Sequence, residues 1–128
     1  MERIIKILVI DDEEEICALT RRFLEKRNFV VFTATNEEAA LEIAKREAPN
    51  IALLDVRLGS VSGMDLLPKL KDINKDLKVI MVTALDDEAS IKEAKSLGAD
   101  DYIAKPFTAE YLNDLIIQRI GSVGIRNR

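Results

Sequence analysis

Short apolar runs and amphipathic segments alternate along the chain five times. The apolar runs are rich in β-branched residues and too short for a useful helix, so they favour strands buried on both faces. We predict strands at residues 4–10, 30–34, 51–54, 78–82 and 101–104. The segments between them carry apolar residues at helical spacing, which predicts helices at about residues 14–27, 37–48, 64–72, 87–97 and 109–119.

Several residues mark where these helices begin or change direction. Asn36 and Thr108 predict N-caps, because their side-chain oxygens can accept hydrogen bonds from N–H groups of the first turn. Asp86 or Asp87 predicts the cap of the fourth helix. Pro68 lacks the N–H of an interior helical residue, which predicts a kink or a late start in the third helix.

Strands that alternate with helices favour one class of fold. Parallel strands need long crossover connections, and helices supply them. We therefore predict an α/β fold in which a doubly wound parallel sheet of five strands, with right-handed crossovers, is flanked by five helices. The 128 residues suit a single domain, and no internal repeat indicates a solenoid.

Charge and hydropathy exclude some functional classes. The net charge of -4 gives no reason to expect nucleic-acid binding through this domain. The apolar runs are far too short to cross a bilayer, and charged residues interrupt the start of the chain where a secretory signal would be apolar. We therefore expect a cytoplasmic protein with no membrane partner.

The chain has one cysteine and no histidine. Cys17 has apolar neighbours, which predicts a small core thiol rather than a nucleophile and fits a reducing compartment. The absence of histidine excludes imidazole relays, histidine-ligated zinc and a phosphohistidine of the chain's own.

Polar residues follow four of the five predicted strands. They are Asp11 and Asp12 after the first strand, Asp55 after the third, Thr83 after the fourth and Lys105 after the fifth. Each one alone is ordinary, since loops are polar. The carboxyl ends of parallel strands meet at one edge of a sheet, where ligands bind in open α/β folds, so we expect these five side chains to share a site.

The chemistry of this set favours a divalent cation and phosphoryl transfer. Three clustered carboxylates repel one another, and Mg²⁺ binds carboxylates, water and phosphate oxygens. A lysine and a threonine around Asp55 suit a transferred phosphoryl group, with Asp55 as the nucleophile that forms an acyl phosphate. The acidic residues 13–15 have a simpler interpretation as charges that complement the dipole of a helix first turn.

Four motifs resemble a known family. The stretches VIDDEEE, LLDVRLGSVSG, IMVTALDD and GADDYIAKPF, in this order and at this spacing, resemble the receiver domain of bacterial two-component response regulators, typified by CheY. The resemblance extends to about residue 120. It implies the CheY-like, or flavodoxin-like, strand order 2-1-3-4-5.

The resemblance also implies roles for the acidic residues. Asp55 would be the phospho-acceptor. Asp12 and Asp55 would bind Mg²⁺ directly, Arg57 would add its backbone carbonyl, and Asp11 would act through water. The phosphoryl donor would be a histidine kinase or a histidine phosphotransfer protein.

Further roles follow for the residues after the fourth and fifth strands. Thr83 and Lys105 would contact the phosphoryl group. Tyr102 stands where the family has its switch aromatic, which turns inward when Thr83 is drawn to the phosphate. Lys105 and Pro106 resemble the family's cis peptide bond.

Two positions depart from the family pattern. Gly59 stands where proline is common, which predicts a looser loop after Asp55. Arg57 brings a long cation beside the site, and this bears on the lifetime of the phosphorylated form.

The leading interpretation is a signalling switch rather than a turnover enzyme. The receiver would span residues 1–121, and residues 122–128 would be a tail or the start of a linker. Its partner would be a downstream protein or an attached output domain. Phosphorylation could also lead to a dimer. One alternative is an aspartate-nucleophile phosphatase of the haloacid dehalogenase type, which needs an Asp where this chain has Arg57. Another is a receiver-like interaction domain that is never phosphorylated.

Overall fold

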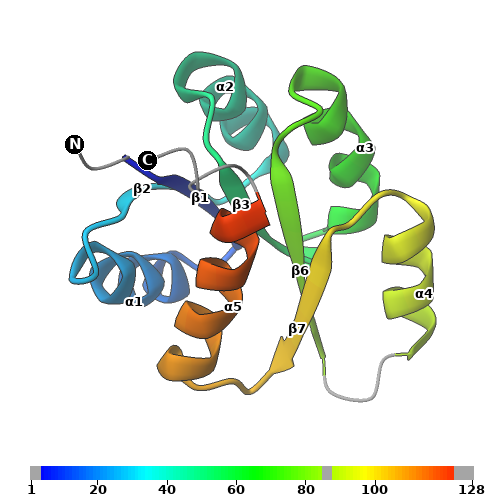
Figure 1. The fold of residues 1–128 in the computed structure, drawn as a ribbon. Coiled ribbons are helices and arrows are strands. Elements are labelled where there is room, and N and C mark those ends of the chain that lie inside the picture. The colour runs from blue at the N-terminus through cyan, green and yellow to red at the C-terminus, as the bar shows by residue number, and fades with distance from the viewer. Residues whose placement is uncertain (1–3, 85–87, 123–128) are drawn as a thin grey trace.

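A five-stranded parallel sheet with helices on both faces forms the molecule (Figure 1). The computed structural model describes residues 4–84 and 88–122, with side chains to residue 119. The strands are β1 (Lys6–Ile10), β2 (Val30–Ala34), β3 (Ile51–Asp55), β4 (Arg57–Leu58), β5 (Val61–Ser62), β6 (Lys78–Ala84) and β7 (Asp101–Lys105). The helices are α1 (Glu14–Glu25), α2 (Glu37–Glu47), α3 (Gly63–Ile73), α4 (Glu88–Ser96) and α5 (Ala109–Ser122).

The sheet has the predicted topology. Its order is β2-β1-β3-β6-β7, with every neighbouring pair parallel, which is the order 2-1-3-4-5 when only its own strands are counted. All five residues of the central strand β3 are buried, as expected for a strand covered by helices on both faces. The predicted α/β fold is therefore confirmed.

Two apolar layers hold the helices against the sheet. Helices α1 and α5 cover one face of the sheet, and α2, α3 and α4 cover the other (Figure 1). The side chains of each group pack against alternate residues of the strands on their own face. Leu8, Leu54 and Leu66 in the second layer are fully buried. Side chains alternate between the faces of a strand, so each strand contributes to both layers.

Most predicted boundaries lie within two residues of the observed ones. The first strand begins at Lys6 rather than at residue 4, because the ladder with β2 starts at the pair Lys6 and Val30. The first helix ends at Glu25, two residues early, and Asn28 then turns the chain with φ of 70°. Strands β3, β6 and β7 each extend far enough to include the polar residues predicted to follow them.

The caps at Asn36 and Thr108 are confirmed. Asn36 Oδ1 accepts from the N–H of Ala39 at 2.8 Å, and Thr108 Oγ1 accepts from the N–H of Tyr111 at 3.0 Å. The late helix start at Pro68 is wrong, because α3 already begins at Gly63 and includes Pro68. Ser62 caps α3 instead, by accepting from the N–H of Met64. The predicted cap at residues 86 and 87 lies outside the described residues.

A small hairpin follows Asp55 where only a loop was predicted. Strands β4 and β5 pair antiparallel, and Gly59 between them has φ of 66°, a conformation that proline cannot adopt. Gly63 closes this segment, since its N–H donates to the carbonyl of Val56 at 2.7 Å. A Cβ at Gly63 would collide with the backbone carbonyl oxygen of Asp55, so this glycine lets α3 begin directly against the end of β3.

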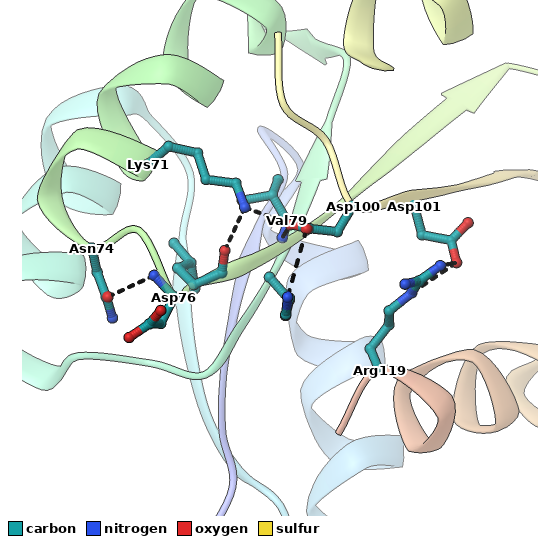
Figure 2. Close-up of polar contacts among 9 residues, drawn as sticks. Lys71, Asn74, Asp76, Val79, Asp100, Asp101 and Arg119 are labelled. Carbon is teal, nitrogen blue, oxygen red and sulfur yellow. Dashed lines mark hydrogen bonds and ion pairs between the residues drawn. The ribbon is translucent and has the colours of Figure 1, made fainter. Parts of the chain in front are cut away.

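An ion-pair network lies at the amino-terminal ends of β6 and β7, away from Asp55 (Figure 2). Asp100 Oδ2 accepts from Lys71 Nζ at 2.6 Å and from the backbone N–H of Val79 at 2.8 Å. Lys71 Nζ also donates to the carbonyl of Leu77 at 2.8 Å. The end of α3, the start of β6 and the start of β7 are thus tied together.

Within residues 4–84 and 88–122, none of the helices combines the length and hydrophobicity that crossing a membrane requires.

Candidate functional site

The three predicted carboxylates meet at the carboxyl edge of the sheet. Asp11 and Asp12 follow β1, and Asp55 is the last residue of the neighbouring strand β3. Each offers a carboxylate oxygen, and these three oxygens lie within 4.8 Å of one another. Asp11 and Asp55 are buried, whereas Asp12 is exposed. The carboxylates thus face a shared space that solvent reaches from the Asp12 side.

Each of these carboxylates accepts a hydrogen bond from a backbone N–H group. Asp11 Oδ1 accepts from Glu13 at 2.9 Å and Asp55 Oδ1 accepts from Arg57 at 3.0 Å. Asp12 Oδ2 accepts from Gly59 at 3.1 Å. The first two are bonds from an Asp to the residue two positions on, a local turn that aspartate commonly forms. Sequence reasoning missed these donors, although the two Asp residues at strand ends were a signal for such turns.

Lys105 is a cation already paired with these carboxylates. Its Nζ lies 2.9 Å from Asp55 Oδ2 and 3.7 Å from Asp11 Oδ2. Partial burial lowers the pKa of Lys105, but the hydrogen bond and charge of Asp55, followed by the charge of Asp11, outweigh it and raise the pKa overall. The peptide bond from Lys105 to Pro106 is cis. The ammonium thus offsets part of the negative charge in the site.

Ionisation of Asp11 is less favourable than that of an ordinary aspartate. Burial, and then the charge of Asp55, raise the pKa of Asp11. The hydrogen bond from the N–H of Glu13 and the charge of Lys105 lower this pKa, but the net effect is a rise.

Cys17 packs next to the backbone of Asp11, and its thiol donates to the Asp11 carbonyl at 3.3 Å. Burial raises the pKa of this thiol, as expected for the core cysteine that the sequence predicts.

Thr83 on β6 lines the cleft that contains Asp55, and Tyr102 lies on the adjacent strand β7. The side chain of Thr83 is nearly inaccessible, and its hydroxyl donates to the carbonyl of Ala84 at 3.1 Å. Tyr102 is half-buried and packs against the apolar layer of α2, α3 and α4. The two residues come from adjacent strands, and Thr83 is paired with Ala104, two residues beyond Tyr102.

A cleft of about 820 Å³ opens over Asp55. Its lining combines acidic, basic and hydroxyl side chains with apolar ones. The lining residues are Asp12, Glu13, Asp55, Val56, Arg57, Thr83, Ala84, Lys105 and Pro106. The cleft brings Asp55 together with both predicted phosphate partners.

The donor set fits a hard divalent cation. Three carboxylates offer oxygen ligands, two of them are buried, and within residues 4–84 and 88–119 Lys105 is the one cation paired with them. Mg²⁺ favours such oxygen ligands and keeps several waters, which the exposed side at Asp12 would admit. Arg57 presents its N–H to Asp55, and its side chain is exposed.

Comparison with known proteins identifies relatives over almost the whole chain. A family model described as the response regulator receiver domain matches residues 7–117. The sporulation initiation phosphotransferase F of Bacillus subtilis is 34% identical over 87% of this chain and 90% of its own length. The alkaline phosphatase synthesis transcriptional regulatory protein of the same organism is 39% identical, over 84% of this chain but only 45% of its own length.

Solved structures give the same result for the fold. A CheY-like receiver domain protein from Methanospirillum hungatei superposes with a TM-score of 0.89 at 29% identity, covering 94% of this chain and 97% of that one. A response regulator from Burkholderia pseudomallei, solved with a phosphorylated aspartic acid, a calcium ion and citrate, gives a TM-score of 0.81 at 31% identity. The match covers 97% of this chain and 75% of that chain.

Proposed function

The chain belongs to the response regulator receiver domain family, and from that premise we propose that it is a switch that is phosphorylated on Asp55 in the presence of Mg²⁺. The observation that carries the proposal is the position of Asp55 in the cleft, 2.9 Å from Lys105 Nζ and beside two further carboxylates. The related Burkholderia pseudomallei protein was solved with a phosphorylated aspartic acid and a bound calcium ion.

The transfer step is a nucleophilic displacement at phosphorus. An oxygen of the Asp55 carboxylate forms the new P–O bond, while the bond between phosphorus and the donor's imidazole nitrogen breaks and its electron pair leaves with the imidazole. Lys105 Nζ and Thr83 Oγ1 can then donate to the oxygens of the phosphoryl group. A bound Mg²⁺, held by Asp11, Asp12, Asp55 and the Arg57 carbonyl, would neutralise negative charge during transfer.

This chemistry serves a switch rather than the turnover of a diffusible substrate. The acyl phosphate on Asp55 is later hydrolysed, which returns the carboxylate and releases inorganic phosphate. The phosphatase alternative is disfavoured, because the position two residues beyond Asp55 is Arg57, whose side chain is exposed and cannot act as a carboxylic acid. Incubation with Mg²⁺ and acetyl phosphate tests the proposal against an unmodified interaction domain, since only a receiver gains a phosphoryl group.

We propose that the receiver spans residues 1–121, which takes in all but the last residue of α5 (Ala109–Ser122). The protein acts in the cytoplasm, where its kinase partner presents the phosphoryl group. A separate protein, an attached output domain or a second copy of the chain receives the signal.

An apolar groove next to the cleft suits the docking of the phosphoryl donor. The groove has a volume of about 420 Å³ and shares Lys105 and Pro106 with the cleft over Asp55. Leu19 on α1 lies in it with 58% of its surface exposed. Because these 128 residues include no histidine, the phosphohistidine must be presented from outside them, and this groove borders the cleft of the acceptor at Lys105 and Pro106.

Truncation of Leu19 should slow transfer from a protein donor without slowing the chemistry. We expect Leu19→Ala to reduce the rate from a purified histidine phosphotransfer protein about tenfold, as for loss of a central apolar contact. Its rate with acetyl phosphate should stay within about twofold of the parent's, since no reacting group changes. Ile117→Ala, which truncates a similarly exposed residue on α5, is the control. Equal rates for both variants with the protein donor would contradict docking at the groove.

The phosphorylation signal leaves the site through Thr83 and Tyr102. When the Thr83 hydroxyl moves toward a phosphate on Asp55, its hydrogen bond to the Ala84 carbonyl breaks. This movement vacates space into which the Tyr102 ring can rotate. The affected surface is formed by α4, β7 and α5. Phosphorylation shifts this equilibrium only through its different interactions with the two states, so Thr83 carries the coupling.

Thr83→Ala should uncouple phosphorylation from this surface. We expect phosphorylation of the parent to change amide exchange in α4, β7 and α5 by about fivefold or more, the lower range of common allosteric couplings. The variant should be phosphorylated but should show little of this change, as measured by hydrogen exchange with mass spectrometry. Thr33→Ala on β2 is the control. A change in Thr83→Ala as large as the parent's would rule out Thr83 as the coupling residue.

A further inference from the structure

Tyr102 contacts a cation on the neighbouring helix. The Nζ atom of Lys95 lies 5.3 Å from the centre of the Tyr102 ring. A cation within about 6 Å of a ring centre is attracted by the negative face of the aromatic system. Because Lys95 belongs to α4 and Tyr102 to β7, the contact connects the helix to the switch aromatic.

Tyr102 and Thr83 lie on the same face of the sheet. In the parallel pair of β6 and β7, Met81 is opposite Tyr102 and Thr83 is opposite Ala104. Side chains two positions apart in a strand share a face, so Thr83 lies on the Met81 side, where the Tyr102 ring packs. The contact with Lys95 therefore accompanies the arrangement in which the Thr83 hydroxyl donates to the Ala84 carbonyl.

We infer that Lys95 is a positioning residue that holds the Tyr102 ring in the orientation that accompanies the hydrogen bond between Thr83 and Ala84. The inference rests on the proposed switch, because it assigns Lys95 to one of its two states. A ring that rotates toward Thr83 leaves the ammonium group of Lys95. Lys95 thus opposes the rotation, and a contact of this kind at an exposed site biases such an equilibrium about two- to fivefold.

Fluorine spectroscopy can observe this ring directly. The chain has two tyrosines and no tryptophan, so labelling with 3-fluorotyrosine gives one fluorine resonance for each tyrosine, and Tyr111→Phe assigns that of Tyr102. Lys95→Gln should shift the Tyr102 resonance before any phosphodonor is added, and Lys95→Arg, which keeps a cation, should restore it. Lys92→Gln changes another exposed lysine of α4 and should leave the resonance unchanged.

Phosphorylation kinetics provide the second readout. If Lys95 opposes the rotation that phosphorylation favours, Lys95→Gln should react with acetyl phosphate about two- to fivefold faster than the parent. An unchanged Tyr102 resonance in Lys95→Gln, or a Lys95→Arg variant that behaves like Lys95→Gln, overturns the inference. If phosphorylation leaves the Tyr102 resonance of the parent protein unchanged, both the switch and the role of Lys95 are overturned. If phosphorylation shifts the parent's resonance, but Lys95→Gln has the same resonance and the same rate as the parent, only the role of Lys95 is overturned.

Discussion

Asp55→Asn should take up no phosphoryl group from acetyl phosphate in the presence of Mg²⁺. The amide lacks the anionic oxygen that forms the bond to phosphorus, so we expect the rate of incorporation to fall by at least ~1,000-fold, as when an enzyme loses its covalent nucleophile. Asparagine keeps nearly the same shape at this buried position. The measurement is the gain of one phosphoryl group in the intact mass over time.

The neighbouring carboxylates make this a selective test. Asp11 is buried, with its Oδ1 bonded to the N–H of Glu13, and Asp12 is exposed with its Oδ2 bonded to Gly59. Either could accept a phosphoryl group if the acceptor were simply any carboxylate of the cluster. Asp65→Asn, which alters an exposed acid in the first turn of α3, should react like the parent. Parent-like incorporation in Asp55→Asn would refute Asp55 as the acceptor.

Mg²⁺ should stabilise the folded protein, and Asp12→Ala should lose most of that gain. An ion that binds only the folded state adds about 2.7 kcal/mol to the free energy of unfolding at about 100 times its Kd. Asp12 is the exposed member of the cluster, so its truncation removes a ligand without opening the core. Thermal unfolding with Mg²⁺ and with excess chelator measures the difference.

The control for the metal experiment is an acid close to the cluster but outside it. Glu15 is exposed in the first turn of α1, and Glu15→Ala should keep the full response to Mg²⁺. The same comparison applies to the chemistry, because transfer from acetyl phosphate should become slow in chelator for the parent and slow at all Mg²⁺ concentrations for Asp12→Ala. A stabilisation by Mg²⁺ that is equal in Asp12→Ala and the parent would mean that the ion binds elsewhere.

The sheet could be predicted because its determinants are local in sequence. Five apolar runs separated by amphipathic segments are enough to identify buried parallel strands and crossover helices. The hairpin of β4 and β5 could not be predicted, because each strand has only two residues and the pairing depends on the turn at Gly59. Likewise Asp100 accepts hydrogen bonds from Lys71, 29 positions away, and from the backbone N–H of Val79. No local pattern in the sequence indicates contacts between residues so far apart.

The site was predictable as a set of residues but not as a set of contacts. Parallel strands must end at a common edge, so the polar residues at the carboxyl ends of β1, β3, β6 and β7 had to approach one another. The distance between Lys105 and Asp55, and the additional contact with Asp11, depend on side-chain conformations that the sequence does not specify. The contact of Lys95 with Tyr102 depends on how α4 packs against the sheet.

The burial of Cys17 makes the protein convenient for site-specific labelling. Its side chain is 3% exposed, and burial raises the pKa of its thiol, so the thiolate that reacts with maleimides is scarce and shielded. A cysteine introduced at an exposed position such as Lys92 on α4 would react far faster than the native one. A fluorophore can therefore be attached to this helix without first replacing Cys17, which keeps the packing behind Asp11 intact while the environment of α4 is monitored in real time.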